Sequence, residues 1–394
     1  MLALVTAVGC TFQKSDEEMT LKEIMHTYYD QKGFYLGASG KDKYFDEQPE
    51  LLSVFAETFS HNTPENEFKQ VRVYSGPGEK WFNDDYMDFI ELARENDQTI
   101  RCHGPISPQC SKYVTEDCRT PEELEHMLEH YMTNLCKDLE ENKDVVKWMD
   151  VVNETVVAAD IHGNGYDAQY DKDTVLYKVG DWFGPLTGQF QWENPWTKLG
   201  FDTVVFEGSD FVVPRYIVRA FKIASQKAPN IKLVFNQDGY DLPVLVWNKI
   251  FKTVRYLRSI GLRVDCVAYQ CHIPLGWEKN PKNITSLKGV IDQAHANDLE
   301  FIISELDVWI DGEINDFNAE DRAQLRRDQG ATIAAVVEVM LQNIDKGATA
   351  INFWTMSDNR WLKGKTFSTL LEPDGTPHDG YDRTKELLLK YAHD

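Results

Sequence analysis

Along this chain, short runs rich in β-branched and aromatic residues alternate with longer segments whose apolar residues recur at helical spacing. From about residue 20 onward the alternation predicts eight strands: Gly33–Gly37, Thr58–Thr63, Thr99–His103, Val145–Asn153, Lys232–Asn236, Val264–Cys271, Glu300–Leu306 and Thr349–Thr355. It also predicts eight helices: Glu47–Glu57, Asp84–Asn96, Pro121–Asn142, Ser209–Ala228, Val244–Ile260, Ile284–Asn297, Ala319–Lys346 and Arg383–His393. Eight consecutive strand–helix units predict an α/β fold, a (β/α)8 TIM barrel formed by residues 21–394 as one domain.

An open, doubly wound sheet would also be built from alternating strands and helices. When such a sheet binds a dinucleotide, it ordinarily has a glycine-rich turn between its first strand and a helix. Here Leu36-Gly-Ala-Ser-Gly40 leads into charged residues, which favours the closed barrel and argues against a dinucleotide. No cysteine spacing in the sequence resembles a zinc site, so we expect neither a metal nor another cofactor.

The carboxyl ends of the predicted strands carry polar or aromatic side chains, whereas the strand bodies consist of Val, Ile, Leu and Phe. The residues at these ends are Glu65, Asn66, Lys69, His103, Asn153, Glu154, Asn236, Gln270, His272, Glu305 and Trp354. In (β/α)8 barrels this is the face that carries the chemistry. Core packing alone does not explain the distribution, so we expect the active site there.

Two of these strands, in Lys147–Glu154 and Phe301–Asp307, combine a buried apolar run with a terminal glutamate. A carboxylate at the end of a buried strand is costly to place, because it loses hydration there. A barrel would bring Glu154 and Glu305 to one mouth, and paired carboxylates are the usual means of cleaving a glycosidic bond. The pair predicts a glycoside hydrolase; the alternative is two ion-paired structural residues.

The segment between Glu154 and Asn236 is much longer than one helix requires. Its surplus, roughly residues 160–207, is rich in Tyr, Trp and Phe, which makes it too aromatic for a disordered linker. We expect an ordered insertion that overhangs the cleft after the fourth strand. A small core packed under a long loop would account for the rings equally well.

Acidic residues dominate the charge, with 64 Asp and Glu against 41 Lys and Arg and a formal net charge of −23. Binding to nucleic acid or to an anionic membrane depends on clustered cations, so neither is an expected partner. An uncharged polysaccharide or oligosaccharide is compatible with this charge, and aromatic rings can lie against the apolar faces of its sugars. We expect a monomer.

Residues 1–20 begin with Met-Leu-Ala-Leu-Val-Thr-Ala-Val-Gly-Cys10, an apolar run that ends on small residues before a cysteine. The run resembles the end of a bacterial lipoprotein signal, although it has no basic n-region, and a buried first strand is the alternative. We expect export, as a periplasmic or cell-surface lipoprotein anchored at Cys10 or as a secreted protein. Export would permit disulfides, with Cys110 and Cys118 the expected pair.

The two glutamate segments resemble the signatures of glycoside hydrolase family 10, the retaining endo-β-1,4-xylanases. That family shows Trp-Asp-Val-Val-Asn-Glu and Thr-Glu-Leu-Asp, where this chain has Trp148-Met-Asp-Val-Val-Asn-Glu154 and Ser304-Glu-Leu-Asp307. Three further segments resemble family motifs in the same order: Thr63-Pro-Glu-Asn-Glu-Phe-Lys69, Gln270-Cys-His272 and Phe353-Trp-Thr-Met-Ser-Asp-Asn-Arg-Trp361. The chain is identified as a divergent member, with a resemblance that runs from about Gly33 to Trp361.

The resemblance implies a double-displacement hydrolase of xylan or of a related or decorated β-linked polysaccharide. Glu154 would be the general acid/base and Glu305 the nucleophile, with carboxyl groups about 5–5.5 Å apart. Asn153 would bond the sugar 2-hydroxyl, and His272 would bridge Glu305 and Asp307, a carboxylate behind the nucleophile. The other substrate-binding residues would be Glu65, Asn66, Lys69, His103, Gln270, Trp354 and Trp361.

The chain departs from the family pattern after the third strand. Ser107 and Pro108 stand where the family has a Trp and a second His that enclose the reacting sugar. Gln70 follows Lys69 where the family has Trp. Two alternatives therefore stay open: a related retaining glycosidase that acts on another β-glycan, and a glycan-binding barrel without catalysis.

Overall fold

The computed structural model describes residues 14–74, 76, 85–115, 120–156, 178–179, 182–183, 194–238, 244–359 and 364–393. Cys10, Cys118, Trp361 and most of the expected insertion lie outside these residues. None of the described helices combines the length and apolarity needed to cross a lipid bilayer.

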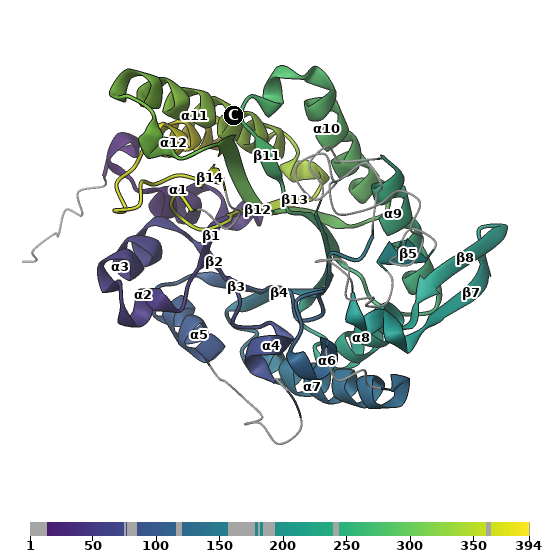
Figure 1. Ribbon diagram of the computed structural model, residues 1–394. Coiled ribbons are helices and arrows are strands. Elements are labelled where there is room, and N and C mark those ends of the chain that lie inside the picture. The colour runs from purple at the N-terminus through teal and green to yellow at the C-terminus, as the bar shows by residue number, and fades with distance from the viewer. Residues whose placement is uncertain are drawn as a thin grey trace, which may run out of the picture.

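Eight parallel strands form a closed barrel, seen along its axis in Figure 1. They are β1 (Tyr35–Gly40), β2 (His61–Pro64), β3 (Thr99–Cys102), β4 (Val146–Asn153), β9 (Lys232–Gln237), β10 (Cys266–Tyr269), β12 (Glu300–Asp311) and β13 (Ala348–Phe353). Each pairs with its neighbour in this order, and pairing of β13 with β1 closes the ring. The predicted (β/α)8 fold is confirmed.

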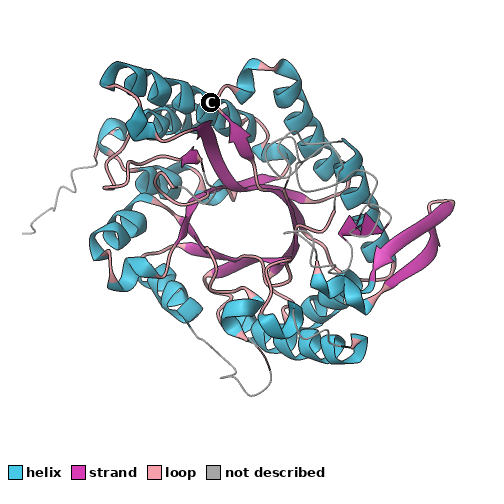
Figure 2. Cartoon of the chain, viewed as in Figure 1, coloured by secondary structure: helices cyan, strands magenta, loops and turns pink. Residues whose placement is uncertain are grey.

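Helices surround the barrel on its outside (Figure 2). The main ones are α3 (Pro49–Thr58), α5 (Asp85–Glu95), α7 (Pro121–Glu141), α8 (Arg215–Lys227), α9 (Val244–Ser259), α10 (Pro281–Ala296), α11 (Ala319–Leu341) and α12 (Asp379–Ala392). Shorter helices are α1 (Leu21–Tyr28), α2 (Lys43–Asp46), α4 (Gln70–Val73) and α6 (Lys112–Thr115). Local sequence signals explain where the helices begin. At the start of α7, the Thr120 hydroxyl accepts a hydrogen bond from the Glu123 N–H. Pro121 suits the first turn because a backbone N–H there would have no partner within the helix.

The amino-terminal end of the barrel is filled by side chains. A cluster made of Trp148, Val234, Cys266, Ala268, Ile302 and Ala350 is buried there, separate from the larger core between sheet and helices. Trp148 Nε1 donates to Glu300 Oε2 at 3.1 Å, so its polar edge is satisfied as well. The opposite, carboxyl end, here called the mouth, carries the polar strand-end residues.

Four predicted strand boundaries need correction. The second strand begins at His61 and not at Thr58, because Thr58 is the last residue of α3. The first strand begins at Tyr35, because Gly33 has a left-handed φ of 66° and belongs to the preceding turn. The predicted strand Val264–Cys271 is interrupted at Cys271, whose φ is 67°, and continues as β11 (His272–Pro274). The seventh strand does not end at Leu306: β12 continues because β11 and the antiparallel β14 (Lys365–Ser368) pair with its second half.

The prediction of a helix starting at Ser209 is wrong. Phe201–Phe206 (β7) and Ser209–Pro214 (β8) form an antiparallel hairpin that projects from the side of the barrel (Figure 1). Its two-residue turn, Glu207 and Gly208, has positive φ at both positions, 53° and 75°, as the tight hairpin turns require. The helix α8 therefore begins only at Arg215.

The described end of the expected insertion does not overhang the mouth. Pro195–Leu199 forms a 3-10 helix that packs against α7 and α8 on the outer side of the barrel, with Trp196 fully buried. The segment also includes two short paired strands, β5 (Lys178–Val179) and β6 (Trp182–Phe183). For residues 157–177 and 184–193, which lie outside the described residues, the overhang stays a prediction.

Cys110 is a free thiol, contrary to the expected disulfide with Cys118. Its Sγ donates to the Ser107 carbonyl oxygen at 3.0 Å, and burial raises the pKa of the thiol. Cys266 and Cys271 are also free and belong to different packing clusters, one inside the barrel and one outside it.

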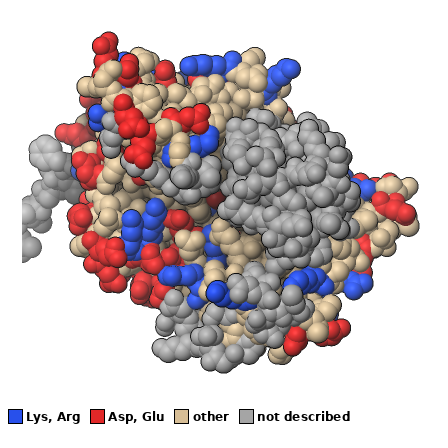
Figure 3. Space-filling model, viewed as in Figure 1, with Lys and Arg blue, Asp and Glu red and all other residues tan. Residues whose placement is uncertain are grey.

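The surface shown in Figure 3 carries many acidic side chains, which gather over α2 and α3 at one side of the barrel. These groups are exposed and hydrated, which agrees with a mainly solvating role for the net negative charge.

Candidate active site

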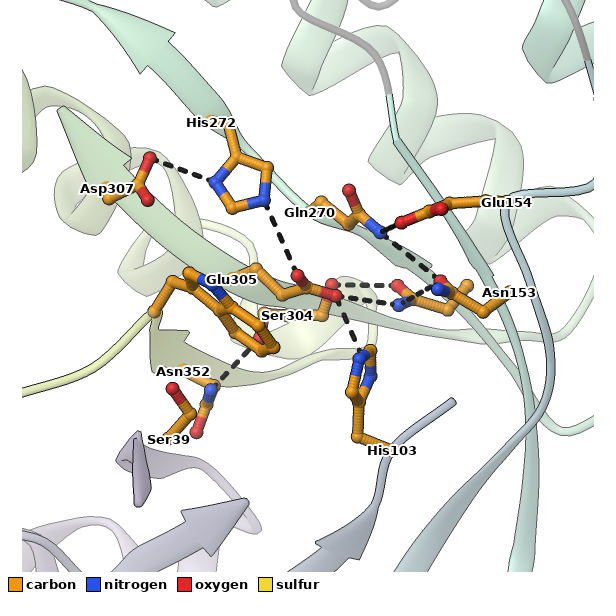
Figure 4. A network of polar contacts seen from close by, with 12 residues as sticks. Ser39, His103, Asn153, Glu154, Gln270, His272, Ser304, Glu305, Asp307 and Asn352 are labelled. Carbon is orange, nitrogen blue, oxygen red and sulfur yellow. Dashed lines mark hydrogen bonds and ion pairs between the residues drawn. The ribbon is translucent and has the colours of Figure 1, made fainter. Parts of the chain in front are cut away.

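Glu305 lies at the centre of a polar network at the mouth of the barrel (Figure 4). Its side chain is buried, although β12 continues past it. Oε1 accepts a hydrogen bond from Asn236 Nδ2 at 3.0 Å and lies 3.7 Å from His103 Nδ1, and Oε2 lies 3.4 Å from His272 Nε2. Burial opposes ionisation, but His103, His272 and Arg101 outweigh it and hold the pKa of Glu305 at about 2.

His272 lies between two buried carboxylates. Its Nδ1 is 2.9 Å from Asp307 Oδ1, and its Nε2 faces Glu305. Burial lowers the pKa of His272, but Asp307 and then Glu305 raise it more, so the pKa is about 10. At neutral pH the ring is therefore a cation, and it keeps the Glu305 carboxylate charged and oriented.

A second ion pair lies beneath Glu305, inside the barrel. Arg101 and Asp150 are fully buried and paired, with 2.6 Å between Arg101 Nη1 and Asp150 Oδ2. The same carboxylate oxygen lies 2.9 Å from His103 Nδ1, and Arg101 Nη2 donates to the Ser304 carbonyl oxygen at 2.8 Å. The pair fixes the His103 ring and anchors the backbone next to Glu305.

Glu154 follows directly after β4 and has a left-handed φ of 53°. Gln270 Nε2 donates to Glu154 Oε1 at 2.9 Å and to Asn153 Oδ1 at 3.2 Å, as Figure 4 shows. Asn236 Nδ2 donates to the same Asn153 oxygen at 2.8 Å and also to Glu305. The two glutamates therefore belong to one chain of hydrogen bonds; their separation of about 5–5.5 Å stays a prediction.

Lys69 and its neighbours line the mouth beyond β2. The Lys69 side chain is buried, and its Nζ donates to Asn66 Oδ1 at 3.0 Å and to Gln109 Oε1 at 2.6 Å. Burial lowers the pKa of Lys69, partly offset by the charges of Glu305 and Glu154. Glu65 Oε2 lies 3.8 Å from Lys41 Nζ, so Glu65 faces a cation at the rim.

Trp354 lies against both active-site histidines. Its ring centroid is 5.2 Å from that of His103 and 6.2 Å from that of His272, both edge-on. Thr355, which follows, has a left-handed φ of 71° that a β-branched residue rarely adopts. The Thr355 N–H donates to Ser39 Oγ at 2.7 Å, and its hydroxyl donates to the Ser357 carbonyl at 2.5 Å. These bonds hold the strained backbone in place.

Most residues named from the sequence meet at this mouth. One polar network with Trp354 against it contains His103, Asn153, Glu154, Gln270, His272, Glu305, Asp307 and Trp354. Glu65, Asn66 and Lys69 lie beside it, and Trp361 lies outside the described residues. Among the described residues, no group of His, Cys, Asp and Glu could hold a metal ion.

The structure brings four further residues to the network that the sequence-based site does not include: Arg101, Asp150, Asn236 and Gln109. For the first two a signal existed, because each is a charged residue within an apolar strand. Asn236 was recognised only as a strand-end residue. Nothing in the local sequence distinguishes Gln109.

The closed barrel and its paired glutamates, one of them buried and ionised, define the class: a retaining glycoside hydrolase. The family model described as glycosyl hydrolase family 10 matches residues 24–183 and 206–387. The chain belongs to that family.

Known xylanases are similar to the chain over most of its length. Endo-1,4-beta-xylanase A of Caldicellulosiruptor saccharolyticus is 27% identical and is matched over 95% of this chain and 98% of its own length. A second enzyme of that name, from Caldicellulosiruptor sp. (strain Rt8B.4), is 24% identical over 80% of this chain. The match covers only 41% of that enzyme's own length.

The fold is that of solved xylanase structures. Native xylanase 10B from Thermotoga maritima has a TM-score of 0.72, with 21% identity over 95% of this chain and 99% of the other. Xylanase 10B from Thermotoga petrophila RKU-1, solved in complex with xylobiose, has the same TM-score at 20% identity, over 96% and 99%.

Proposed function

We propose that this protein is an endo-β-1,4-xylanase that cleaves β-linked xylan, including decorated xylan, with retention of configuration. The observation that carries the proposal is the contrast between the two glutamates of one network. Glu305 is buried beside the His272 cation and is ionised, whereas Glu154 accepts one hydrogen bond from the Gln270 amide. One carboxylate is thus prepared to attack, and the other is placed to exchange a proton.

In the first step Glu305 attacks the anomeric carbon while Glu154 protonates the leaving glycosidic oxygen. The C–O bond to the leaving sugar breaks as the bond to the Glu305 oxygen forms. His272 and Arg101 stabilise the attacking carboxylate until its charge is consumed. In the second step Glu154 removes a proton from water, whose oxygen displaces Glu305 from the sugar.

Asn153 is suited to bind the sugar 2-hydroxyl. Its side-chain oxygen already accepts from Asn236 and Gln270, so the NH2 group is the part available to a substrate. A contact of this kind strengthens in the transition state. Trp354 would lie against an apolar face of the same sugar.

The departures after β3 suggest a glycon site shaped differently from that of a plain xylanase. Ser107 is buried at the position where the family has a Trp. Gln109 Oε1 accepts a hydrogen bond from Lys69 Nζ at the rim. Gln70 is buried and bonds Ser111, so it supports the loop and does not face a sugar. The smaller side chain at residue 107 favours binding of a substituted sugar at the glycon site.

We also propose that the protein is exported and that it is a monomer. After removal of the preceding segment, Cys10 would become the lipidated first residue, or the protein would be secreted without an anchor; in both cases it would meet its substrate outside the cytoplasm. Mass spectrometry of the mature N-terminus from cells tests this.

The function is tested by incubating the protein with xylan, substituted xylans, mixed-linkage β-glucan and galactan. We expect short oligosaccharides from xylan, and 1H NMR should show the β-anomer forming first. Glu305→Ala and Glu154→Ala should each abolish release of reducing sugar. Asp311→Asn, which removes an exposed carboxylate from the same strand as Glu305, should not. Hydrolysis that persists in both glutamate variants would refute the assignment.

The alternatives give different results in the same panel. Cleavage of galactan or glucan but not xylan identifies another retaining β-glycanase. Glycan binding without cleavage on any substrate identifies a binding barrel.

A further inference from the structure

We propose that Gln237, the last residue of β9, is a positioning residue whose side chain fixes the backbone that follows Glu154. The family motifs found in this chain do not include Gln237. The inference deepens the proposed function and rests on it for the role of Glu154 as the acid. The hydrogen bonds that Gln237 forms, however, are a property of the folded chain alone.

Glu154 needs support from the residues that follow it. The register of β4 and β9 ends with Asn153 opposite Asn236, and Glu154 then turns away with its left-handed φ of 53°. This conformation costs a non-glycine residue of order 1–2 kcal/mol, which favours relaxation of the chain. The Glu154 N–H donates to the Asn236 carbonyl at 3.3 Å, which is long for such a bond. A restraint beyond Glu154 is therefore needed to keep its carboxyl group in one place.

The Gln237 side chain supplies this restraint. Its Oε1 accepts hydrogen bonds from the N–H groups of Thr155 and Val156, both at 3.1 Å. Its Nε2 donates to the Val156 carbonyl oxygen at 3.2 Å and also to Asp238. A side-chain amide offers an acceptor and a donor, as a peptide unit does. Gln237 therefore takes the place of a strand partner for Thr155 and Val156.

These hydrogen bonds lie away from solvent. Gln237 and Thr155 are fully buried, and Val156 is almost fully buried. A buried N–H that loses its partner costs roughly 1–3 kcal/mol, because water does not replace the bond. Thr155 and Val156 would therefore move if Gln237 could no longer accept from them. Glu154 directly precedes them, so its carboxyl group would move as well.

Gln237 also fixes the residue that contacts the Glu154 carboxyl group. The Gln270 N–H donates to the Gln237 carbonyl oxygen at 3.1 Å. The Gln270 side-chain amide in turn donates to Glu154 Oε1 at 2.9 Å (Figure 4). Both the backbone that follows the acid and the group that orients it are thus bonded to one residue. A change of the Gln237 side chain releases only the first, because Gln270 is bonded to the Gln237 backbone.

A displaced acid slows cleavage only where the leaving group needs a proton. The oxygen of a leaving sugar must be protonated by Glu154 as the glycosidic bond breaks. A 2,4-dinitrophenolate is stable as an anion and leaves without that proton. Because kcat/KM reports the steps up to the first bond cleavage, the later attack of water does not enter it. Two substrates with the same glycon therefore separate the position of Glu154 from general damage to the site.

The first test is kcat/KM of Gln237→Met on xylotetraose and on 2,4-dinitrophenyl β-xylobioside, each at the variant's own pH optimum. We expect a loss of roughly 100-fold on xylotetraose and of less than about 3-fold on the aryl xylobioside. An equal loss on both substrates, or no loss on either, overturns the proposal. Gln237→Glu keeps an acceptor but loses the donor, so its ratio of the two values should lie between those of wild type and Gln237→Met. If Gln237→Met does not fold, a Gln237→Glu ratio equal to that of wild type overturns the proposal.

The matched control is Gln98→Met. Gln98 is also buried, and its amide donates to the Phe59 carbonyl at 2.8 Å and accepts from Asn62 at 3.2 Å. It directly precedes β3, at the opposite end of the barrel from Glu154. Gln98→Met should lower the urea midpoint but leave the ratio of the two kcat/KM values as in wild type. A control ratio that changes as much as that of Gln237→Met also overturns the proposal.

The second test is amide hydrogen exchange in the full-length protein, which needs no substrate. In wild type the N–H groups of Thr155 and Val156 should exchange at least about 100-fold more slowly than in an unstructured peptide. In Gln237→Met they should exchange roughly 10-fold faster than in wild type. Rapid exchange in wild type, or an unchanged rate in the variant, overturns the proposal. If wild type cleaves neither substrate, the proposed function fails, yet these rates still decide whether Gln237 fixes the backbone that follows Glu154.

Discussion

Replacing His272 by Asn should weaken the fold and shift the acidic limb of activity upward. Asn can keep a donor near the position of Nδ1, which lies 2.9 Å from Asp307, but it brings no positive charge. The substitution leaves two buried carboxylates, Asp307 and Glu305, without the cation between them. An uncompensated buried charge is among the most destabilising changes in a protein interior.

Two estimates of the magnitude agree. The pKa of His272 is raised from 6.5 to about 10, and at about 1.4 kcal/mol per unit this corresponds to roughly 5 kcal/mol. Coulomb's law for the 3.4 Å contact with Glu305, at an effective dielectric of about 20, also yields roughly 5 kcal/mol. Relaxation around the site reduces this, so we expect a loss of about 3–5 kcal/mol at pH 6.

The pH dependence has a definite sign. A histidine whose pKa is raised on folding stabilises the protein fully below its unfolded value, 6.5, and this stabilisation disappears as pH rises toward about 10. Urea unfolding of wild type and His272→Asn at pH 6 and pH 9.5 should therefore show a large difference at pH 6 and a small one at pH 9.5. In activity, the pKa of Glu305 should rise from about 2, which moves the acidic limb of kcat to higher pH.

The matched control is His26→Asn, since His26 forms only an exposed pair with Asp30 and should change stability by less than about 1 kcal/mol. The reasoning is refuted if His272→Asn costs no more than His26→Asn at pH 6. It is equally refuted if the stability difference stays constant up to pH 9.5.

Three further substitutions test the scaffold by urea unfolding. Gly37→Ala should cost about 1–3 kcal/mol, because its Cβ would meet the His61 carbonyl oxygen of the adjacent strand; a smaller loss would mean that β1 and β2 can separate. Arg326→Met should cost about 3–5 kcal/mol, because it leaves the buried Asp358 carboxylate unpaired, and a neutral result would contradict that pairing. At Thr355, glycine should be better tolerated than valine by at least about 1 kcal/mol, since only glycine relieves the left-handed backbone; equal losses would mean that the strain is negligible.

Periodicity and strand-end chemistry were sufficient to predict the barrel and the meeting of Glu154 and Glu305 in one polar network. Most strand bodies are rich in apolar residues, and Glu154 and Glu305 stand at the end of such runs, where packing gives no reason for a charge. Parallel strands place all their carboxyl ends on one face of the barrel. The order of the strands along the chain then determines which strand-end side chains lie near one another. That argument needs no knowledge of side-chain geometry.

The same reasoning could not find contacts that depend on neighbouring strands. β12 continues to Asp311 because β11, and β14 more than fifty residues later in the chain, pair with its second half. Arg101 and Asp150 neutralise one another across β3 and β4, so neither strand alone shows why its charge is buried.

Backbone strain at the mouth explains how the strands aim their functional groups. Among the described non-glycine residues with positive φ, Glu154, Cys271 and Thr355 each lie at the carboxyl end of a barrel strand, while the others lie in turns between elements. One left-handed residue turns the chain off the strand direction, so that Glu154, His272 and Trp354 need not follow the strict alternation of a strand. Each such residue costs of order 1–2 kcal/mol. The bonds that oppose this strain also form the site, as when Thr355 donates to Ser39 and Glu154 to Asn236. The left-handed turns at the mouth and the hydrogen bonds that hold them therefore also place its functional side chains.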